Sequence, residues 1–136
     1  FRERQRQTIA NAARMAERLQ EGGIALVSGG TDNHLMLADL TNLGITGIEA
    51  ENRLEEVGIT VNKNAVPYDE LPPTVTSGIR LGTPAVTTRG FKEPEMDEVS
   101  EIILATLSPH VTPAELKKLR KRTKELLAGF PLYPNL

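Results

Sequence analysis

Residues 62–91 read NKNAVPYDELPPTVTSGIRLGTPAVTTRGF, and the rest of the chain is organised around this stretch. The segment from Pro67 to Pro73 is too rich in proline for a helix or a central strand, so we expect a loop there. Residues 76–82 are then expected to form a strand in which Arg80 points opposite to Ile79 and Leu81. The sequence therefore predicts an arginine displayed on one face of a sheet while its neighbours enter the core.

The surroundings of Arg80 give this residue two possible roles. Gly78 and Gly82 flank it at a distance of two residues and would let another backbone or a ligand come close. A guanidinium group grips two oxygen atoms at once, which suits a carboxylate or a phosphate. An edge-strand arginine that only faces water fits the same residues equally well. Both interpretations stay open on the residues alone.

Length and composition exclude several classes of protein. The chain has 136 residues, enough for one domain with one core, and it is 39% hydrophobic and 25% charged, as in an ordinary globular domain. It has no cysteine, which excludes disulfides and thiolate metal sites, and its net charge of −2 offers no overall attraction to nucleic acid. We expect no membrane span, no signal peptide and a cytoplasmic location. Because the sequence enters a helical pattern directly at Phe1, we expect it to be cut from a longer protein.

Apolar periodicity predicts four main helices. The first spans Arg2 to Glu21, with an apolar face that is followed by Gly22-Gly23. The second starts at the capping residue Thr46 and runs to about Val57. The third begins at Pro94, and the fourth follows the cap Thr112-Pro113. The apolar face of the first helix is Ile9, Ala12, Ala13, Ala16 and Leu19. That of the third helix is Met96, Val99, Ile103 and Leu107. That of the fourth helix is Leu116, Leu119, Leu126 and Leu127. The basic residues on the other faces of the first and last helices are interpreted as solvated.

Short strands fall between these helices. Residues 24–27 and 35–40 are expected to form a hairpin, residues 59–61 a short strand, and Thr83-Pro84 the start of a helical turn. The order of elements predicts a two-layer α+β domain with a short, mainly antiparallel sheet and helices packed on it. We expect a single domain over residues 1–136, with a leading helix at 1–22, an α+β body at 24–129 and a tail at 130–136.

Three possible sites look weak from the residues. Gly29-Gly30 lacks the spacing of a phosphate-binding loop, and Ser28, Asp32 and His34 are close in sequence without the geometry that a nucleophilic triad needs. His34 is better explained as a packed histidine. His110 lies in a loop far along the chain, so the two histidines do not predict a metal site.

Long strings of the central stretch nevertheless resemble one enzyme family. The triplet Asn62-Lys63-Asn64, the proline-rich loop and the string TSGIRLGTPAVTTRGF resemble serine hydroxymethyltransferase. The block SGGTDNH at residues 28–34 matches the same family in the expected order. The resemblance covers the whole chain, but it covers only the C-terminal third of that enzyme.

This resemblance implies a fold, a reaction and partners. The family has the type I aminotransferase-like fold, in which a large domain binds pyridoxal phosphate and a small C-terminal domain completes the active site. Its members interconvert serine and tetrahydrofolate with glycine and methylenetetrahydrofolate, a reaction of one-carbon metabolism and amino-acid biosynthesis. The expected partners are the missing large domain, a second subunit in a homodimer, the serine or glycine substrate and folate.

The family's motifs assign roles to several residues of this chain. The arginine of the Thr-Ser-Gly-Ile-Arg string, here Arg80, binds the carboxylate of the amino-acid substrate. The second asparagine of Asn-Lys-Asn, here Asn64, reaches the pteridine ring, and Lys63 is expected to touch the acidic folate tail. The family's folate-lining Ser-Pro-Phe is replaced here by Pro72, Pro73 and Thr74. For Arg89 we expect only a structural ion pair.

What the chain lacks limits what it can do alone. No lysine has the sequence context of the family's Schiff-base lysine, so we expect no catalytic residue here and no activity of the fragment by itself. The alternatives are a free-standing module that binds folate or small carboxylates, and a purely structural domain. The enzyme-domain interpretation predicts an apolar docking surface, whereas the binding-module interpretation predicts a closed pocket around Arg80.

Overall fold

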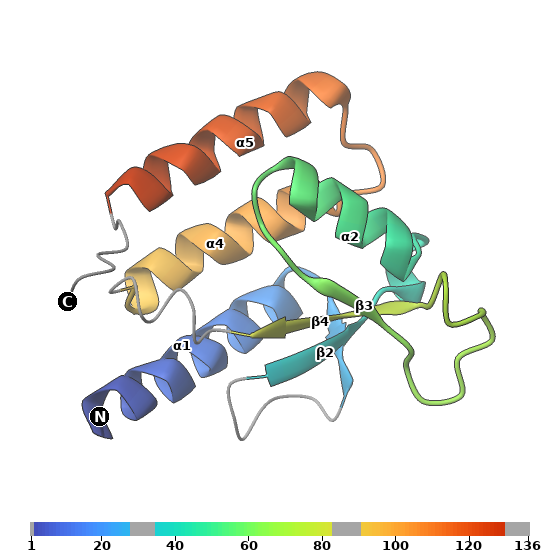
Figure 1. The fold of residues 1–136 in the computed structure, drawn as a ribbon, viewed down its shortest axis with the longest axis horizontal. Helices are drawn as coiled ribbons and strands as arrows, with labels where there is room; N and C mark the ends of the chain where they lie inside the picture. The colour runs from blue at the N-terminus through green and yellow to red at the C-terminus, as the bar shows by residue number, and fades with distance from the viewer. Residues whose placement is uncertain (1, 28–34, 83–90, 130–136) are drawn as a thin grey trace.

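The computed structural model describes residues 2–27, 35–82 and 91–129 of the chain (Figure 1). The helices are α1 (Arg2–Glu21), α2 (Gly47–Glu56), α4 (Glu93–Thr106) and α5 (Pro113–Ala128), with a short 3-10 helix η2 (Thr41–Leu43). The strands are β1 (Ala25–Leu26), β2 (Leu35–Asp39), β3 (Asn62–Asn64) and β4 (Gly78–Gly82). Four of the predictions concern residues outside the described ones: the block 28–34, the Thr83-Pro84 turn, Arg89 and the tail 130–136.

The four strands form one sheet in the order β1-β2-β4-β3, and every neighbouring pair is antiparallel. The predicted β1–β2 hairpin and the predicted two-layer α+β architecture are both confirmed. Helices α4 and α5 lie side by side above the sheet in Figure 1, α1 lies along α4, and α2 packs against β3 and β4. Helix α5 packs on α4 and α2 and lies farther from the sheet than α4 does (Figure 1).

Burial alternates along the central strands, as a sheet covered on one side requires. Met36, Ala38, Ile79 and Leu81 are buried beneath the helices, whereas Arg80 is exposed. The predicted orientation of Arg80 is therefore confirmed. We call the uncovered side the open face of the sheet. By strand register it carries Ala25, Leu37, Asp39, Asn62, Asn64 and Arg80.

Helix α1 buries a narrower stripe than the sequence predicts. Ala12, Ala16 and Leu19 are buried as expected and Met15 joins them, but Ile9 is 49% exposed and Ala13 is also exposed. The buried stripe follows i, i+3, i+4, i+7 spacing from Ala12, so Ile9 and Ala13 lie toward its solvent side. On the opposite edge Asn11 is buried, and its Nδ2 donates to the carbonyl of Phe91 at 2.9 Å.

An ion-pair cluster joins α1 to α4. Arg14 Nε and Nη2 donate to the two carboxylate oxygens of Asp97 at 2.6 and 3.0 Å, and Arg18 Nε adds a bond of 3.0 Å. The hydrogen bond from Arg14 is the main reason that the pKa of Asp97 lies below its usual value. Two arginines that the sequence assigned to a solvated face therefore also fix the packing of α1 on α4.

The C-terminal helices follow the prediction closely. Helix α4 begins one residue before Pro94, and Met96, Ile103 and Leu107 are buried as expected while Val99 is half-buried. Ile102, which the predicted apolar face did not include, is also buried. At the start of α5 the capping box is present, because Glu115 N donates to Thr112 Oγ1 and Thr112 N donates to Glu115 Oε1, both at 3.2 Å. The α5 lysines are exposed, as predicted.

The strand predicted at residues 59–61 is displaced in the structure. Helix α2 starts after Thr46, whose hydroxyl accepts from Glu49 N, and Gly58 follows the helix with φ of 92°. Ile59 N then donates to the carbonyl of Leu54 at 2.8 Å, so this residue still completes the helix end. Pairing with β4 begins only at Asn62, and the strand is the triplet 62–64 itself.

Among the residues described, no helix combines the length and the apolar character needed to cross a membrane.

Candidate functional site

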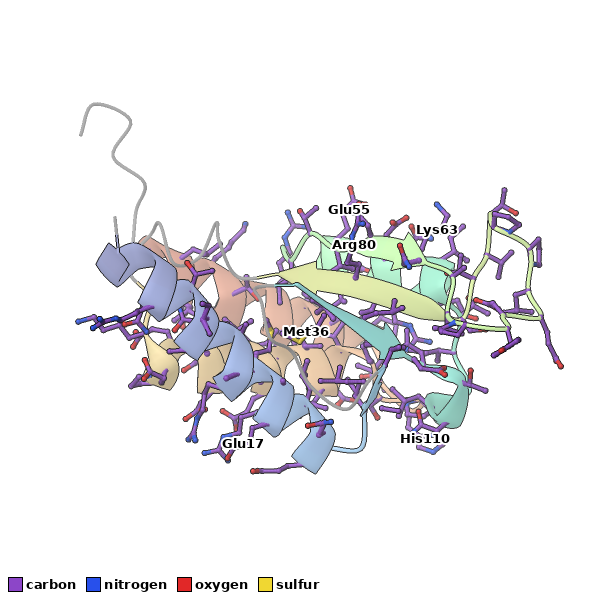
Figure 2. The ribbon with its side chains drawn as sticks, turned by 90° about the horizontal axis from the view of Figure 1, so that it is seen from below. Glu17, Met36, Glu55, Lys63, Arg80 and His110 are labelled. Carbon is purple, nitrogen blue, oxygen red and sulfur yellow. The ribbon has the colours of Figure 1, made fainter. Side chains whose placement is uncertain are left out.

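Arg80 stands at the centre of the open face. It lies on β4, opposite Leu37 of β2 on one side and Asn62 of β3 on the other. Within the described residues its guanidinium has no hydrogen-bond or ion-pair partner. Figure 2 looks at the sheet with β2 and β4 in front of α4 and α5, and labels Arg80 on β4. The buried neighbours Ile79 and Leu81 anchor the strand, so the arginine is presented from a rigid element.

Asn64 lies on the same face as Arg80, one row further along the sheet. It is opposite Gly78, which precedes Arg80 by two residues, so the two rows are separated by about 7 Å. Its Nδ2 donates to the carbonyl of Ala65 at 2.9 Å, and its Oδ1 has no partner among the described residues. The structure therefore brings together a cation and a carboxamide on one face of the sheet.

Lys63 is directed to the other side of β3. Its register partner is the buried Ile79, and its Nζ lies 3.7 Å from Glu51 Oε1 on α2. Its backbone N–H also donates to Glu51 Oε2 at 2.8 Å. Lys63 is thus separated from Arg80 and Asn64 by the sheet, and its expected contact with a folate tail stays a prediction.

The proline-rich connection between β3 and β4 is a loop, as predicted. Pro72, Pro73 and Thr74 are exposed on it, and the carbonyl of Pro72 accepts from the N–H groups of Val75 and Thr76, each at 2.9 Å. This loop projects beyond the sheet at the right of Figure 1. Its three exposed residues are accessible to a ligand, and their expected role in lining a folate site stays a prediction.

Asp69 is the hydrogen-bonding centre of this loop. Its Oδ2 accepts from Val66 N at 3.2 Å and Ser77 N at 2.8 Å, and its Oδ1 accepts from Leu71 N at 2.9 Å and Ser77 Oγ at 2.8 Å. These bonds favour the charged form, the bond from Leu71 most of all, and lower the pKa of Asp69 from 3.8 to about 2.

The lowered pKa of Asp69 predicts acid sensitivity of the loop. A carboxyl whose pKa is lower in the folded than in the unfolded chain stabilises the fold above its unfolded value, and that contribution is lost as the pH falls through the folded value. We expect the loss between about pH 4 and pH 2. Urea unfolding of wild type and Asp69→Asn at pH 6, 4 and 2 measures it. The two proteins should converge in stability toward pH 2, and a constant difference would contradict the assignment.

A second anchor holds the end of the loop against α2. The N–H groups of Gly47 and Ile48, at the start of α2, donate to the carbonyls of Thr76 and Val75 at 2.9 and 3.0 Å. Thr76 is buried with φ of 58°, a left-handed conformation that is rare for a β-branched residue. Its hydroxyl donates to the carbonyl of Gly78 at 3.1 Å. These contacts hold a strained residue two positions before β4.

Asp69, Glu51 and Gly47 support the site, and sequence reasoning did not identify them. The Pro67-Tyr68-Asp69 run carried a turn signal, because an aspartate can accept from backbone amides two residues on. Gly47 follows a helix cap, where glycine is unremarkable in sequence. The bond between Asp69 and Ser77 and the packing of Thr76 on Gly47 join residues distant in the chain, so no local pattern announces them.

Arg80 is exposed within the part of the chain that the structure describes. The apolar cavity of about 290 Å³ lies between α4, α5 and β4 and is lined by residues such as Met96, Ile103 and Leu127, but not by Arg80. In the described part of the chain, the large apolar side chains that are exposed are Ile9, Tyr68 and Leu71. The expected broad apolar docking surface is not seen there, and the open face is mainly polar.

The titratable residues near this face are few within the described part of the chain. The described residues contain no group of three or more His, Cys, Asp or Glu side chains that could hold a metal ion. Lys63 faces Glu51, Lys92 caps α4 and the other lysines lie on α5, so none belongs to the open face. The open face thus offers the guanidinium of Arg80 as a donor to an anion and the carboxamide of Asn64 as a hydrogen-bonding group.

One comparison with known proteins bears on the identity of the chain. The family model described as serine hydroxymethyltransferase matches residues 1–103. The match includes α1, the whole sheet with Asn64 and Arg80, and most of α4. The chain therefore belongs to the serine hydroxymethyltransferase family.

Proposed function

We propose that this chain is the C-terminal domain, residues 1–136, of an enzyme that interconverts serine and tetrahydrofolate with glycine and 5,10-methylenetetrahydrofolate. In this proposal the domain supplies binding groups and the rest of the enzyme, a cytoplasmic homodimer, supplies the catalytic ones. The observation that carries the proposal is the exposed guanidinium of Arg80, presented by a buried strand with no partner among the described residues.

Arg80 is assigned to the carboxylate of the amino-acid substrate. A guanidinium donates two parallel hydrogen bonds to a carboxylate and so fixes both its position and its orientation. The exposure of Arg80 among the described residues favours a half-site that another part of the enzyme closes, over a self-contained binding module. A module that bound small carboxylates by itself would need a pocket enclosing this residue.

Asn64 is assigned to the edge of the folate pterin. A carboxamide offers one acceptor and two donors, which a pterin edge can complement. The Oδ1 atom of Asn64 is available within the described residues, while Nδ2 would exchange its bond to Ala65 for one to the ligand. Pro72, Pro73 and Thr74 would border this ligand through backbone and apolar contacts, because they lack the hydroxyl-aromatic pair of the family's usual segment.

Pyridoxal phosphate, when bound, supplies the electron sink for this reaction. The described residues do not fit that group, since the open face has no lysine to bond it. We therefore propose that the cofactor is held by the large domain and that this chain alone does not turn over serine. The role of its own residues is to bind and orient the two substrates.

Exchanging Arg80 for lysine in the full-length enzyme tests the assignment. Lysine keeps the positive charge but loses the two-pronged grip, so we expect serine binding to weaken by about 2 kcal/mol, roughly 30-fold, with cofactor retention unchanged. Calorimetric titration with serine measures the affinity. Arg120→Lys is the matched control, because Arg120 is exposed on helix α5 and is not part of the sheet. Equal serine affinity in Arg80→Lys and wild type would rule out the carboxylate role.

A further inference from the structure

We propose that Asp69 is a positioning residue that sets Asn64 and Arg80 in register for their two ligands. The inference rests on the proposed function, and it assigns to one carboxylate the alignment of both halves of the binding face. Asp69 does this by closing the loop 65–77, which joins the strand of Asn64 to the strand of Arg80.

The bonds of Asp69 reach both ends of that loop. Val66 N lies two residues after Asn64, and Ser77 N and Oγ lie directly before Gly78, the first residue of β4. The bond to Leu71 N holds the middle of the loop. One side chain therefore fixes the point where the chain leaves β3 and the point where it enters β4.

These two points determine how the binding residues face each other. Gly78 is the register partner of Asn64, and Arg80 is the register partner of Asn62. The carbonyl of Ser77 also accepts a hydrogen bond of 2.8 Å from the N–H of Leu40, the residue that follows β2. Asp69 thus connects the Asn64 row to a strand end that is already fixed to β2. A shift of β3 by one residue would turn Asn64 to the opposite face.

The strand β3 needs this external support. It spans only Asn62–Asn64 at the edge of the sheet, and none of its residues is buried: Asn62 is exposed, and Lys63 and Asn64 are half-buried. An irregular connection as long as 65–77 carries a large ordering cost unless it is held by specific bonds, and such loops are usually functional. Tyr68 and Thr76 adopt left-handed conformations, which are strained and need support from surrounding bonds.

The variant Asp69→Asn weakens these hydrogen bonds with little change in the shape of the side chain. Each carboxylate oxygen of Asp69 accepts two bonds, at least one of them from a backbone N–H. In Asp69→Asn an NH₂ group replaces one of the two oxygen atoms. Whichever oxygen it replaces, the NH₂ group faces a backbone N–H and cannot accept a hydrogen bond from it. Glu70→Gln is the matched control, because it removes the same charge at the adjacent, exposed residue.

The test measures steady-state kinetics of the full-length enzyme carrying Asp69→Asn. We expect the KM values for serine and for tetrahydrofolate to rise together, each about tenfold, with a smaller change in kcat, while Glu70→Gln stays within twofold of wild type. Amide hydrogen exchange on the same proteins should accelerate in residues 65–77 and leave β2 and α4 unchanged. A rise in only one KM, or none, would overturn the inference, and so would faster exchange throughout the sheet.

Two further variants separate this inference from the proposed function. Arg80→Lys should raise the KM for serine alone, and Asn64→Ala should raise the KM for tetrahydrofolate alone. If these single effects occur and Asp69→Asn changes neither KM, the positioning role fails while the proposed function stands. If Arg80→Lys and Asn64→Ala also change nothing, the proposed function itself fails.

Discussion

Replacing Phe91 with alanine is expected to lower the free energy of unfolding by about 4 kcal/mol, the largest effect of any single change considered. The side chain is 1% exposed, and it is the largest of the fully buried side chains among the described residues. It borders the 290 Å³ apolar cavity with Met96 and Leu81, so its removal would enlarge that cavity. The loss combines the burial free energy of the removed aromatic ring with the cost of the cavity that it leaves.

Tyr68 provides the control for Phe91. It is an aromatic residue of similar size but is fully exposed, at 101%, on the loop between β3 and β4. Tyr68→Ala should change the free energy of unfolding by less than about 0.5 kcal/mol. Urea denaturation followed by far-UV circular dichroism measures both variants. Similar losses for the two would show that Phe91 is not part of the core.

The exchange Gly47→Ala is expected to destabilise the chain by about 3 kcal/mol. A Cβ atom at this position would overlap Thr76 Oγ1 and the carbonyl oxygen of Gly78. Thr76 is bonded to the start of α2 and Gly78 is the first residue of β4, so neither atom can move without breaking hydrogen bonds at this junction. Because alanine normally favours a helix over glycine by about 1 kcal/mol, intrinsic propensity predicts the opposite sign.

Gly129→Ala separates the clash from any general effect of losing a glycine. Gly129 has φ of −76°, and a Cβ atom there would lie 3.6 Å from the carbonyl oxygen of Leu126, an ordinary contact. We expect no loss of stability, and a slight gain from the less flexible unfolded chain. Thermal unfolding of both variants gives the comparison. Unchanged stability of Gly47→Ala would mean that Thr76 is free to move away from α2.

The sequence predicted those features that depend on local pattern. Alternation along residues 78–82 was sufficient to place Arg80 opposite Ile79 and Leu81, and capping spacing located the starts of α2 and α5. The position of β3 was missed because strand pairing, not strand propensity, decides it. Residues 59–61 are more apolar, yet Ile59 is still bonded to Leu54 at the helix end and only residues 62–64 reach β4.

The candidate site was predictable only in part. The family resemblance pointed to Asn64 and Arg80, and strand register places both on one face. The same register separates Lys63 from them, because consecutive residues of a strand alternate between faces. Asp69 and Gly47 escaped prediction since their contacts depend on how a long irregular loop folds back onto β4 and α2.

The bond between Glu51 and the backbone of Lys63 has a consequence for association between molecules. β3 is one of the two outer strands of the sheet, and an edge strand with free N–H groups can recruit a strand from another chain. The Glu51 carboxylate already occupies the N–H of Lys63, and the Lys63 ammonium lies 3.7 Å from Glu51 Oε1. A strand arriving at the β3 edge would have to displace both, so this edge is protected against strand addition while the open face of the sheet remains accessible.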